Sequence, residues 1–321
     1  MSSDPLVTIA IPTYNRAEGY LRQSLESALA QTYQNLEVIL SDNCSPDDTG
    51  RLAAEYCRGD KRLTYLRQSR NIGPNSNFNF CLAKAQGRYF LLLPDDDLID
   101  PDFVETCVRA GREDPRAGIV RTGIRVIDDS GVVLWERRNE VRHLPLEEFF
   151  RGWFAGRTAW YVVSTLFDTA RLREVGGFHT KHNLVQDCVA VTKLAARHGR
   201  VDVEDIKATF RLHRGEFTFA VQAVEWGEDF LDLLELMCEL SPPADAALVR
   251  QEGRRFFARL TYDRARSIES PVQRLKAYLD IWRLFDYSIM PPASELARRI
   301  RRRLRRSAAG RLREHRLPEK V

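Results

Sequence analysis

The sequence has no long apolar run. Of its 321 residues 44% are hydrophobic, yet no stretch reaches the ~18 to 20 uninterrupted apolar residues of a membrane-spanning helix. Residues 1–5 lack the charged and apolar regions of a secretory signal peptide. We therefore expect a cytoplasmic protein with one large domain and an appendage, since the length and composition are those of an ordinary globular chain.

Two common motif classes are also missing. The six cysteines form no CxxC pair, and several lie in apolar helical patterns, so we interpret them as reduced core residues. The sequence contains neither GxGxxG nor GxxxxGK[ST], so a Rossmann dinucleotide site and a P-loop are not indicated. Phosphates bound by this chain would then be held through a metal ion in preference to a glycine-rich turn.

A net positive charge is absent outside the C-terminal segment. Residues 291–321 hold ten Arg and one Lys against three Glu, a net charge of +8, so the total of +4 leaves −4 for residues 1–290. The basic character therefore belongs to the C-terminal segment.

The first hundred residues alternate short apolar runs with helical patterns. Runs at 6–11, 36–40, 63–66 and 89–93 predict strands, and apolar residues at helical spacing separate them. Strands that alternate with helices predict an α/β domain whose mostly parallel sheet is covered on both faces.

Polar side chains gather where these predicted strands end. The run Tyr89–Leu93 leads to three consecutive aspartates, Asp95, Asp96 and Asp97. Crowded carboxylates repel one another, so a hard divalent cation is the simplest compensating partner. The alternative is a solvated turn in which Asp97 or Asp100 caps a helix, but one cap accounts for only one aspartate. Because ligands bind at this edge of open α/β sheets, the loops suit a nucleotide diphosphate with its metal.

The motifs at this edge, taken in order, carry a family resemblance. The segments that carry it are 7–16, 41–49, 71–73, 93–97, 172–178 and 186–187. With these segments the chain resembles the family 2 glycosyltransferases of GT-A fold, with a weaker similarity to their abequosyltransferase-like and rhamnosyltransferase-like members, which build bacterial surface polysaccharides. The resemblance covers about residues 6–215 and implies a GT-A sheet with a C-terminal helical appendage.

The resemblance implies a nucleotide-sugar site in the N-terminal half. Tyr14, or the backbone beside it, would lie against the base, and Asp42 would accept a hydrogen bond from the base's ring N–H. The structural alternatives are a half-buried aromatic ring for Tyr14 and a turn former for Asp42. The implied donor-site residues are Pro12, Thr13, Tyr14, Arg16, Asp42, Arg70, Asn71, Gly73 and Asp95.

The same resemblance implies a site for Mn²⁺ or Mg²⁺. Counted back from Pro101, Asp96 and Asp97 match the family's last two acidic positions, whereas Pro94 replaces its first aspartate. Asp96 would then be the direct ligand, with Asp95 at the ribose or the metal's water shell and Asp97 as an assisting ligand or helix-start residue. His213 resembles a histidine that binds the metal in many relatives, and a hydrogen-bonded structural role is its alternative.

Asp187 matches the family's catalytic base, with Gln186 in place of a glutamate. In an inverting transfer it would remove the proton from the acceptor hydroxyl. Plain capping at a helix N-terminus is the competing role.

We predict a glycosyltransferase domain over residues 1–216, with a nucleotide-sugar half (1–100) and an acceptor half (101–216), followed by a helical region over 217–321. Residues 124–128 and 132–135 predict a hairpin in the acceptor half. Trp153, Trp160 and Tyr161 are candidates for stacking on sugar rings, with core packing as the alternative.

From residue 217 the apolar spacing predicts helices over 225–240, 246–267 and 272–285. A narrow apolar stripe within the basic segment 294–316 predicts a peripheral helix drawn to the anionic inner face of the plasma membrane. A solvated tail and a nucleic-acid contact are its alternatives, and we expect no nucleic-acid partner.

The sequence as a whole predicts a metal-dependent inverting glycosyltransferase. It would move a sugar from a nucleotide-diphosphate donor to a glycan or lipid-linked acceptor in cell-surface polysaccharide synthesis. A catalytically silent nucleotide-sugar-binding or glycan-binding relative is the alternative, because Pro94 and Gln186 replace acidic residues. A nucleic-acid-associated protein would leave the edge loops unexplained.

Overall fold

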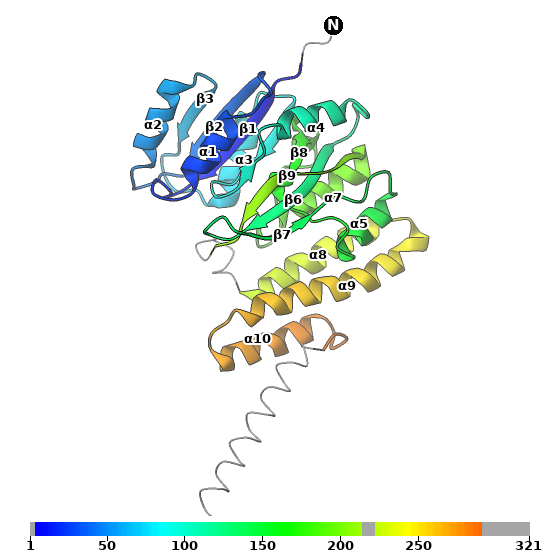
Figure 1. The fold of residues 1–321 in the computed structure, drawn as a ribbon. Helices are drawn as coiled ribbons and strands as arrows, with labels where there is room; N and C mark the ends of the chain where they lie inside the picture. The colour runs from blue at the N-terminus through cyan, green and yellow to red at the C-terminus, as the bar shows by residue number, and fades with distance from the viewer. Residues whose placement is uncertain (1–3, 214–221, 291–321) are drawn as a thin grey trace, which may run out of the picture. The chain divides into compact units, whose positions relative to one another are not determined.

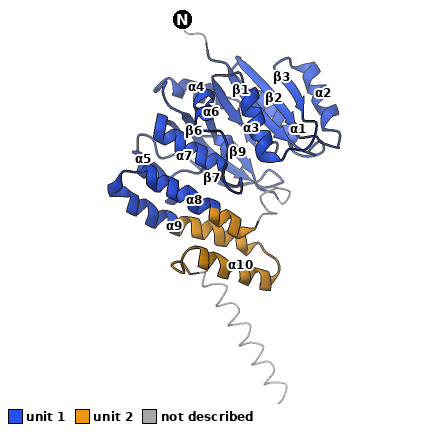
Figure 2. Cartoon of the chain, turned by 180° about the vertical axis from the view of Figure 1, so that it is seen from behind, with its two compact units in different colours: residues 1–221, 229–254 blue, residues 222–228, 255–321 orange. Residues whose placement is uncertain are grey.

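The computed structural model describes residues 4–213 and 222–290 (Figure 1). The chain divides into two compact units, residues 1–221 with 229–254 and residues 222–228 with 255–321 (Figure 2). The boundary predicted at residues 216 and 217 lies outside the described residues. Every strand named below belongs to the first unit.

The N-terminal part of the first unit is a parallel α/β sheet, as predicted. Strands β1 (Val7–Thr13), β2 (Leu36–Asp42), β3 (Leu63–Arg67) and β4 (Tyr89–Leu92) pair in the order β3-β2-β1-β4. Helices α1 (Leu21–Leu29), α2 (Thr49–Gly59) and α3 (Pro74–Lys84) connect them. Every residue of β1 and β4 is buried, which explains why these strands are continuous apolar runs in the sequence.

Strand β1 is the point at which the order of the parallel strands changes side. The chain adds β2 on one side of β1 and β4 on the other, so the boundary between β1 and β4 is a topological switch point. The pairing of these two strands ends at Ala10 and Leu92, while β1 continues to Thr13. Pro12 and Thr13 therefore extend past the end of β4, at the edge where such sheets bind ligands.

The C-terminal half of the sheet mixes strand directions. It contains β8 (Thr165–Asp168), β6 (Ile119–Ile127), β9 (Arg200–Arg211) and the short β5 (Leu98–Ile99), in the order β4-β8-β6-β9-β5. Strand β8 is antiparallel to both neighbours, whereas β6 and β9 are parallel. Strands β6 and β7 (Val133–Arg137) form the predicted hairpin, whose turn contains Gly131 at a φ of 87°. The helices of this half are α4 (Phe103–Gly111), α5 (Leu146–Phe154), α6 (Thr169–Glu174) and α7 (Gln186–His198), with a 3₁₀ turn η1 (Val162–Ser164).

The predicted C-terminal helices are α8 (Ala223–Leu240), α9 (Pro243–Arg266) and α10 (Pro271–Leu284). Helix α10 begins where the sequence predicts, because the Ser270 hydroxyl accepts a hydrogen bond from the Gln273 N–H and Pro271 occupies the first turn. No helix among the described residues is long and apolar enough to cross a bilayer. The basic segment 294–316 lies outside the described residues. All six cysteines are free, as predicted. Four of them, Cys81, Cys107, Cys188 and Cys238, are buried as expected of core residues, but Cys44 and Cys57 are only partly buried.

Candidate functional site

A cavity of about 660 Å³ lies at the carboxyl edge of the parallel strands, where β1 and β4 part. Most of its wall comes from the loops that the sequence singles out. The lining residues are Pro12, Thr13, Tyr14, Arg16, Asn43, Asn71, Pro74, Asn77, Phe78, Pro94, Asp95, Asp96, Asp97 and Phe210. The fold therefore brings the end of β1, the end of β2, the start of α3 and the aspartate triplet to one site.

Asp95 is bound to the end of β1. The Thr13 hydroxyl donates a 2.6 Å hydrogen bond to its carboxylate, and Arg16 Nε lies 3.8 Å from its other oxygen. Burial, followed by the negative charge of Asp96, raises the pKa of Asp95 to about 7. A cation placed against this pair would offset both effects, so the triplet is electrostatically suited to receive one.

Asp96 and His213 form the closest pair of candidate metal ligands. Their Oδ2 and Nε2 atoms are 2.9 Å apart, and both side chains are largely buried. The ring of His213 also packs on that of Tyr20, with centroids 5.1 Å apart. The described residues contain no cluster of three or more His, Cys, Asp or Glu side chains that could hold a metal ion. One carboxylate and one imidazole fit an ion whose other ligands come from a bound diphosphate.

Asp97 holds the end of β9 against the triplet. Its buried carboxylate accepts a 2.9 Å hydrogen bond from the Arg211 N–H. The Arg211 side chain in turn donates to the Asp96 carbonyl at 3.1 Å and to Gln23 at 2.7 Å. His213 follows two residues later, so these bonds position it beside Asp96. The structure thus gives Asp97 a structural partner in addition to its place in the cavity wall.

Asp42 is fully buried and is not among the residues that line the cavity. Its carboxylate accepts hydrogen bonds from the Tyr65 hydroxyl at 2.6 Å and the Ser45 N–H at 2.8 Å, and Arg67 Nε lies 3.5 Å away. Burial and the hydrogen bond to Asp42 raise the pKa of the Tyr65 hydroxyl above its ordinary range. The next residue, Asn43, reaches the cavity instead.

Asn43, Asn77 and Phe78 line the cavity and are absent from the sequence-based set. Asn43 donates to the Asn71 side chain at 2.9 Å and accepts from the Ile72 N–H at 2.9 Å, which fixes the turn before α3. The sequence signal for Asn43 is its place directly after β2, beside Asp42. Asn77 and Phe78 carry no such signal, because they lie within a helix.

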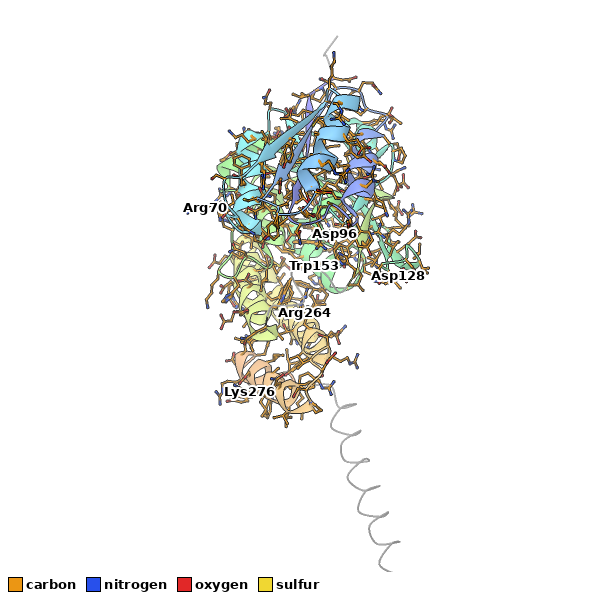
Figure 3. The ribbon with its side chains drawn as sticks, turned by 90° about the vertical axis from the view of Figure 1, so that its left-hand side faces the viewer. Arg70, Asp96, Asp128, Trp153, Arg264 and Lys276 are labelled. Carbon is orange, nitrogen blue, oxygen red and sulfur yellow. The ribbon has the colours of Figure 1, made fainter. Side chains whose placement is uncertain are left out.

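Besides Asp42, two predicted donor-site residues are not among those that line the cavity. Arg70 is exposed and lies at the outline of the first unit in Figure 3, whereas Asp96 lies nearer its middle. Gly73 precedes α3 with a φ of 82°, a conformation that favours glycine, and Pro74 beside it contributes to the cavity wall. Tyr14 lines the cavity with 45% of its surface exposed.

Asp187 lies in the first turn of α7, whose N-cap is Val185. Burial raises the pKa of Asp187, and the nearby Arg121 charge partly opposes the shift. A carboxylate with a raised pKa is a better proton acceptor near neutral pH. The adjacent Gln186 Oε1 is buried and has no hydrogen-bond donor among the described residues. Neither side chain is among those that line the cavity.

The loop before Asp187 is held by Asp229 of α8, a residue that sequence reasoning missed. Asp229 is fully buried. Its carboxylate accepts hydrogen bonds from the Thr180 hydroxyl at 2.6 Å, the His182 N–H at 3.0 Å and the Leu184 N–H at 3.1 Å. One side chain therefore fixes the backbone that leads into α7.

Two of the three aromatic residues considered for sugar stacking belong to the core. Trp153 and Trp160 are 9% and 6% exposed, and their rings stack 4.4 Å apart. The buried Arg121 guanidinium lies 5.2 Å from the Trp160 ring. Core packing, the alternative reading, is therefore correct for this pair. Tyr161 instead packs on Phe210 of the cavity wall, with centroids 4.6 Å apart.

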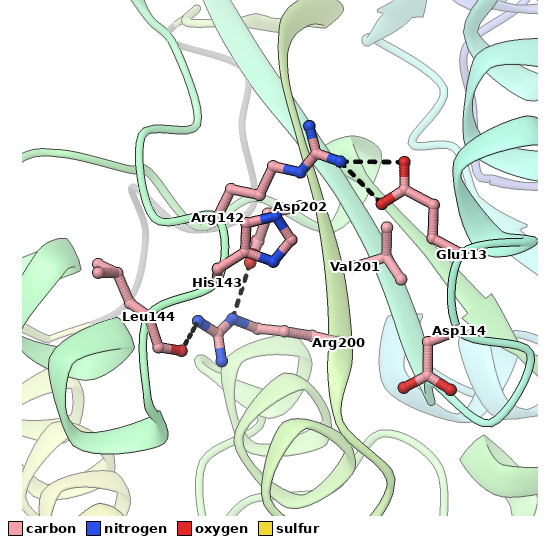
Figure 4. Close-up of a pocket in the computed structure, with 8 residues that line it drawn as sticks. All are labelled: Glu113, Asp114, Arg142, His143, Leu144, Arg200, Val201 and Asp202. Atoms are coloured by element: carbon pink, nitrogen blue, oxygen red, sulfur yellow. Dashed lines mark hydrogen bonds and ion pairs between the residues drawn. The ribbon is translucent and has the colours of Figure 1, made fainter.

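A second pocket of about 270 Å³ lies at the opposite end of β9 (Figure 4). Its Arg200 is 2.9 Å from Asp202 and donates to the Leu144 carbonyl at 2.7 Å, while Arg142 makes two bonds to Glu113. Both guanidinium groups are thus already bonded to carboxylates, and the pocket has no unpaired guanidinium to offer an anion.

Solved structures of similar fold include two that were determined with nucleotide sugars. The TarS 1–349 structure from S. aureus in complex with UDP-GlcNAc matches with a TM-score of 0.64 at 18% identity, over 87% of this chain and 81% of that one. The mannosyltransferase PcManGT from Pyrobaculum calidifontis, in complex with GDP-Man and Mn²⁺, matches with a TM-score of 0.59 at 18% identity, over 94% and 81%. These likenesses confirm the predicted GT-A fold with its C-terminal helices.

Curated relatives match in sequence over part of their length. An uncharacterised glycosyltransferase of Rickettsia typhi is 36% identical over 43% of this chain and 42% of its own length. The chondroitin synthase of Escherichia coli is 39% identical over 40% of this chain and 18% of its own length. The chain thus spans less than half the length of these relatives. The model of the family "Glycosyl transferase family 2" matches residues 8–172, just over half of the chain, and the protein therefore belongs to that family.

Proposed function

We propose that this protein transfers a sugar, with inversion, from a nucleotide-diphosphate donor to a glycan or lipid-linked acceptor. The observation that carries the proposal is the cavity at the β1–β4 switch point, with Asp95 and Asp96 in its wall and His213 Nε2 2.9 Å from Asp96 Oδ2. Its volume of about 660 Å³ is in the range of pockets that enclose small ligands.

The donor is held by residues on different sides of the cavity. Pro12, Thr13, Tyr14, Asn43 and Asn71 contribute the wall on the nucleotide side. Arg16, which already lies 3.8 Å from Asp95, is a cation in reach of the same space. Asp42 supports this wall from within through Tyr65 and Ser45, and the adjacent Asn43 offers the polar side chain that reaches the cavity.

The reaction exchanges one bond for another. A hydroxyl oxygen of the acceptor attacks the anomeric carbon, and the bond from that carbon to the diphosphate breaks with its electron pair on the leaving oxygen. Asp187 accepts the proton of the attacking hydroxyl, a role suited to its raised pKa. Asp96 and His213 would hold a divalent cation, whose positive charge would offset the negative charge of the leaving diphosphate. Arg211 keeps His213 beside Asp96 through its hydrogen bonds to the Asp97 carboxylate and the Asp96 carbonyl.

The proposal extends to the identity of the donor and to the pathway. UDP-GlcNAc and GDP-Man, which are bound in the two related structures, are the first donors to test. Deoxyhexose donors follow, because the motifs resemble abequosyltransferase-like and rhamnosyltransferase-like proteins. A role in cell-surface polysaccharide synthesis fits these relatives and an acceptor carried on a lipid.

The test is a thermal-shift screen of UDP-, GDP-, CDP- and dTDP-sugars with Mn²⁺, followed by a hydrolysis assay of each stabilising donor. A ligand at 100 times its Kd stabilises the fold by about 2.7 kcal/mol, which is readily measured. We expect the sugars of one nucleotide class to raise the Tm of the protein only when Mn²⁺ is present. We also expect the protein to hydrolyse these donors slowly. Binding without any hydrolysis or transfer would favour the catalytically silent relative, and no stabilisation by any donor would contradict the proposal.

A further inference from the structure

An aromatic row crosses three strands of the sheet beside the donor cavity. Val126 of β6 pairs with Trp135 of β7 on one side and with Phe210 of β9 on the other. Directly paired residues of neighbouring strands point to the same face of a sheet. Trp135, Val126 and Phe210 therefore share one face, with Trp135 at the outer end and Phe210 in the cavity wall.

Tyr161 joins the two aromatic ends of this row. Its ring lies 4.6 Å from that of Phe210 and 6.3 Å from that of Trp135, measured between centroids. We name Trp135, Tyr161 and Phe210 the aromatic surface. It begins in the cavity wall and ends at β7, which pairs with β6 alone in the described sheet.

The outer end of the aromatic surface is exposed to solvent. Trp135 is 38% exposed, and all five residues of β7 are exposed. A large aromatic side chain on an exposed edge strand is an aggregation risk that proteins usually avoid, so its presence indicates a partner.

The opposite face of the same three strands is polar. Arg125 of β6 donates to Glu136 of β7 at 2.9 Å and to the Thr209 hydroxyl of β9 at 3.2 Å. Arg125 and Glu136 thus place an ion pair on the face opposite the aromatic surface. A hairpin that inserted into lipid would have to bury this ionic face as well, at a high desolvation cost.

We propose that the aromatic surface binds the acceptor oligosaccharide, whose sugar rings stack on Trp135 and Tyr161 while its terminal hydroxyl reaches the cavity at Phe210. This inference rests on the proposed function and adds the class of acceptor to it. Aromatic rings present an apolar face to the C–H groups of a sugar, and Tyr and Trp retain a polar group for its hydroxyls. Strands β9 and β7 are two strand spacings apart, about 10 Å, which exceeds one sugar ring and favours an oligosaccharide.

The experiment measures oligosaccharide binding by the full chain with Mn²⁺ and the nucleotide product of the donor that the screen identifies. The probes are chondroitin hexasaccharide, maltohexaose, chitohexaose and the core oligosaccharide of a bacterial lipopolysaccharide. We expect the wild type to bind at least one probe, Trp135→Ala to weaken that binding about tenfold, and Trp135→Phe to retain most of it. Leu134→Ala is the matched control, because Leu134 is the apolar neighbour of Trp135 on β7 and is similarly exposed, at 47%.

Three results would overturn the proposed role of the aromatic surface. The first is equal binding by Trp135→Ala and the wild type, and the second is no probe bound by a wild type that binds donor. The third is binding to phosphatidylglycerol vesicles that Trp135→Ala and Leu134→Ala weaken equally, which would assign the hairpin to lipid. Donor affinity, measured in the same samples, separates this inference from the proposed function: a wild type that binds no donor refutes the latter.

Discussion

At the scale of single residues, Asp42 and Asn43 show how neighbouring polar side chains take different tasks. Asp42 is the last residue of β2, and Asn43 is the first residue after it. Asn43 lines the cavity, whereas Asp42 is buried and bonded to Tyr65 and Ser45. In the proposed donor site, Asp42 would therefore act through the wall that it supports.

Asp42→Ala is expected to destabilise the fold. The substitution leaves the Tyr65 hydroxyl and the Ser45 N–H without their acceptor, at a cost of about 1–3 kcal/mol per unsatisfied group. Urea denaturation measures the change in the free energy of unfolding. Adding Tyr65→Phe to the same variant should recover part of the loss, because one orphaned donor is then removed. A variant as stable as the wild type would contradict this account.

Asp187→Asn tests the proposed base. The amide has the same shape and carries no buried charge, so the variant should fold and bind donor normally. Transfer should fall by a factor on the order of 10² or more, the usual contribution of a general base. The control is Arg197→Gln, an exposed position on the same helix, which should leave transfer unchanged. Near-normal turnover by Asp187→Asn would remove the assignment.

At the scale of secondary-structure elements, the parallel half of the sheet could be predicted because strands that are buried on both faces are apolar runs in the sequence. Tyr89–Leu92 is such a run and is followed closely by the aspartates, and the buried strands β1 and β2 are likewise mostly apolar and end at polar residues. The position of β8 could not be predicted. It is only four residues long, and its place between β4 and β6 depends on tertiary pairing.

The candidate site was predictable to the same extent. The loops after β1 and β4 were identified, because every strand of a parallel sheet ends at one edge. Asp229 was not, since its partners lie 45 to 49 residues earlier in the chain and no local pattern marks such a contact. Helical periodicity places Asp229 in α8 but says nothing about the loop that it binds.

Asp229→Asn tests the link between α8 and the loop that precedes Asp187. The amide replaces one accepting oxygen with a donor, so at least one of the three hydrogen bonds to residues 180–184 is lost. We expect kcat to fall while the Kd for donor stays unchanged, because the loop leads to Asp187 and not to the nucleotide wall. Asp232→Asn, at an exposed position on the same helix, is the matched control. Equal kinetics for both variants would refute a positioning role.

At the scale of the whole molecule, charge is divided between the two ends of the chain. Residues 1–290 carry a net charge of −4 and residues 291–321 carry +8. Within residues 1–290, ion pairs such as that of Arg151 with Glu252 neutralise some of the surface charges of the first unit. The basic C-terminal residues are therefore the main source of attraction for an anionic surface.

Deletion of residues 294–321 tests this attraction. Because each Lys or Arg near an anionic bilayer contributes about 1 kcal/mol, the shortened protein should no longer co-sediment with phosphatidylglycerol vesicles. Transfer to a soluble acceptor should persist, since the cavity residues lie between 12 and 210. Undiminished vesicle binding after the deletion would exclude a membrane role for the segment. RNA binding that is tighter in the full chain than in the shortened protein would assign the segment to nucleic acid.

The most direct measurement of the central claim is the calorimetric Kd of the stabilising donor with Mn²⁺, with excess EDTA, and in Asp96→Asn. The account predicts measurable binding by the wild type with Mn²⁺ and a loss of at least tenfold both in EDTA and in Asp96→Asn, because Asp96 and His213 would hold the cation that offsets the charge of the diphosphate. Binding that is equally tight in all three experiments would contradict a metal site at the aspartate triplet.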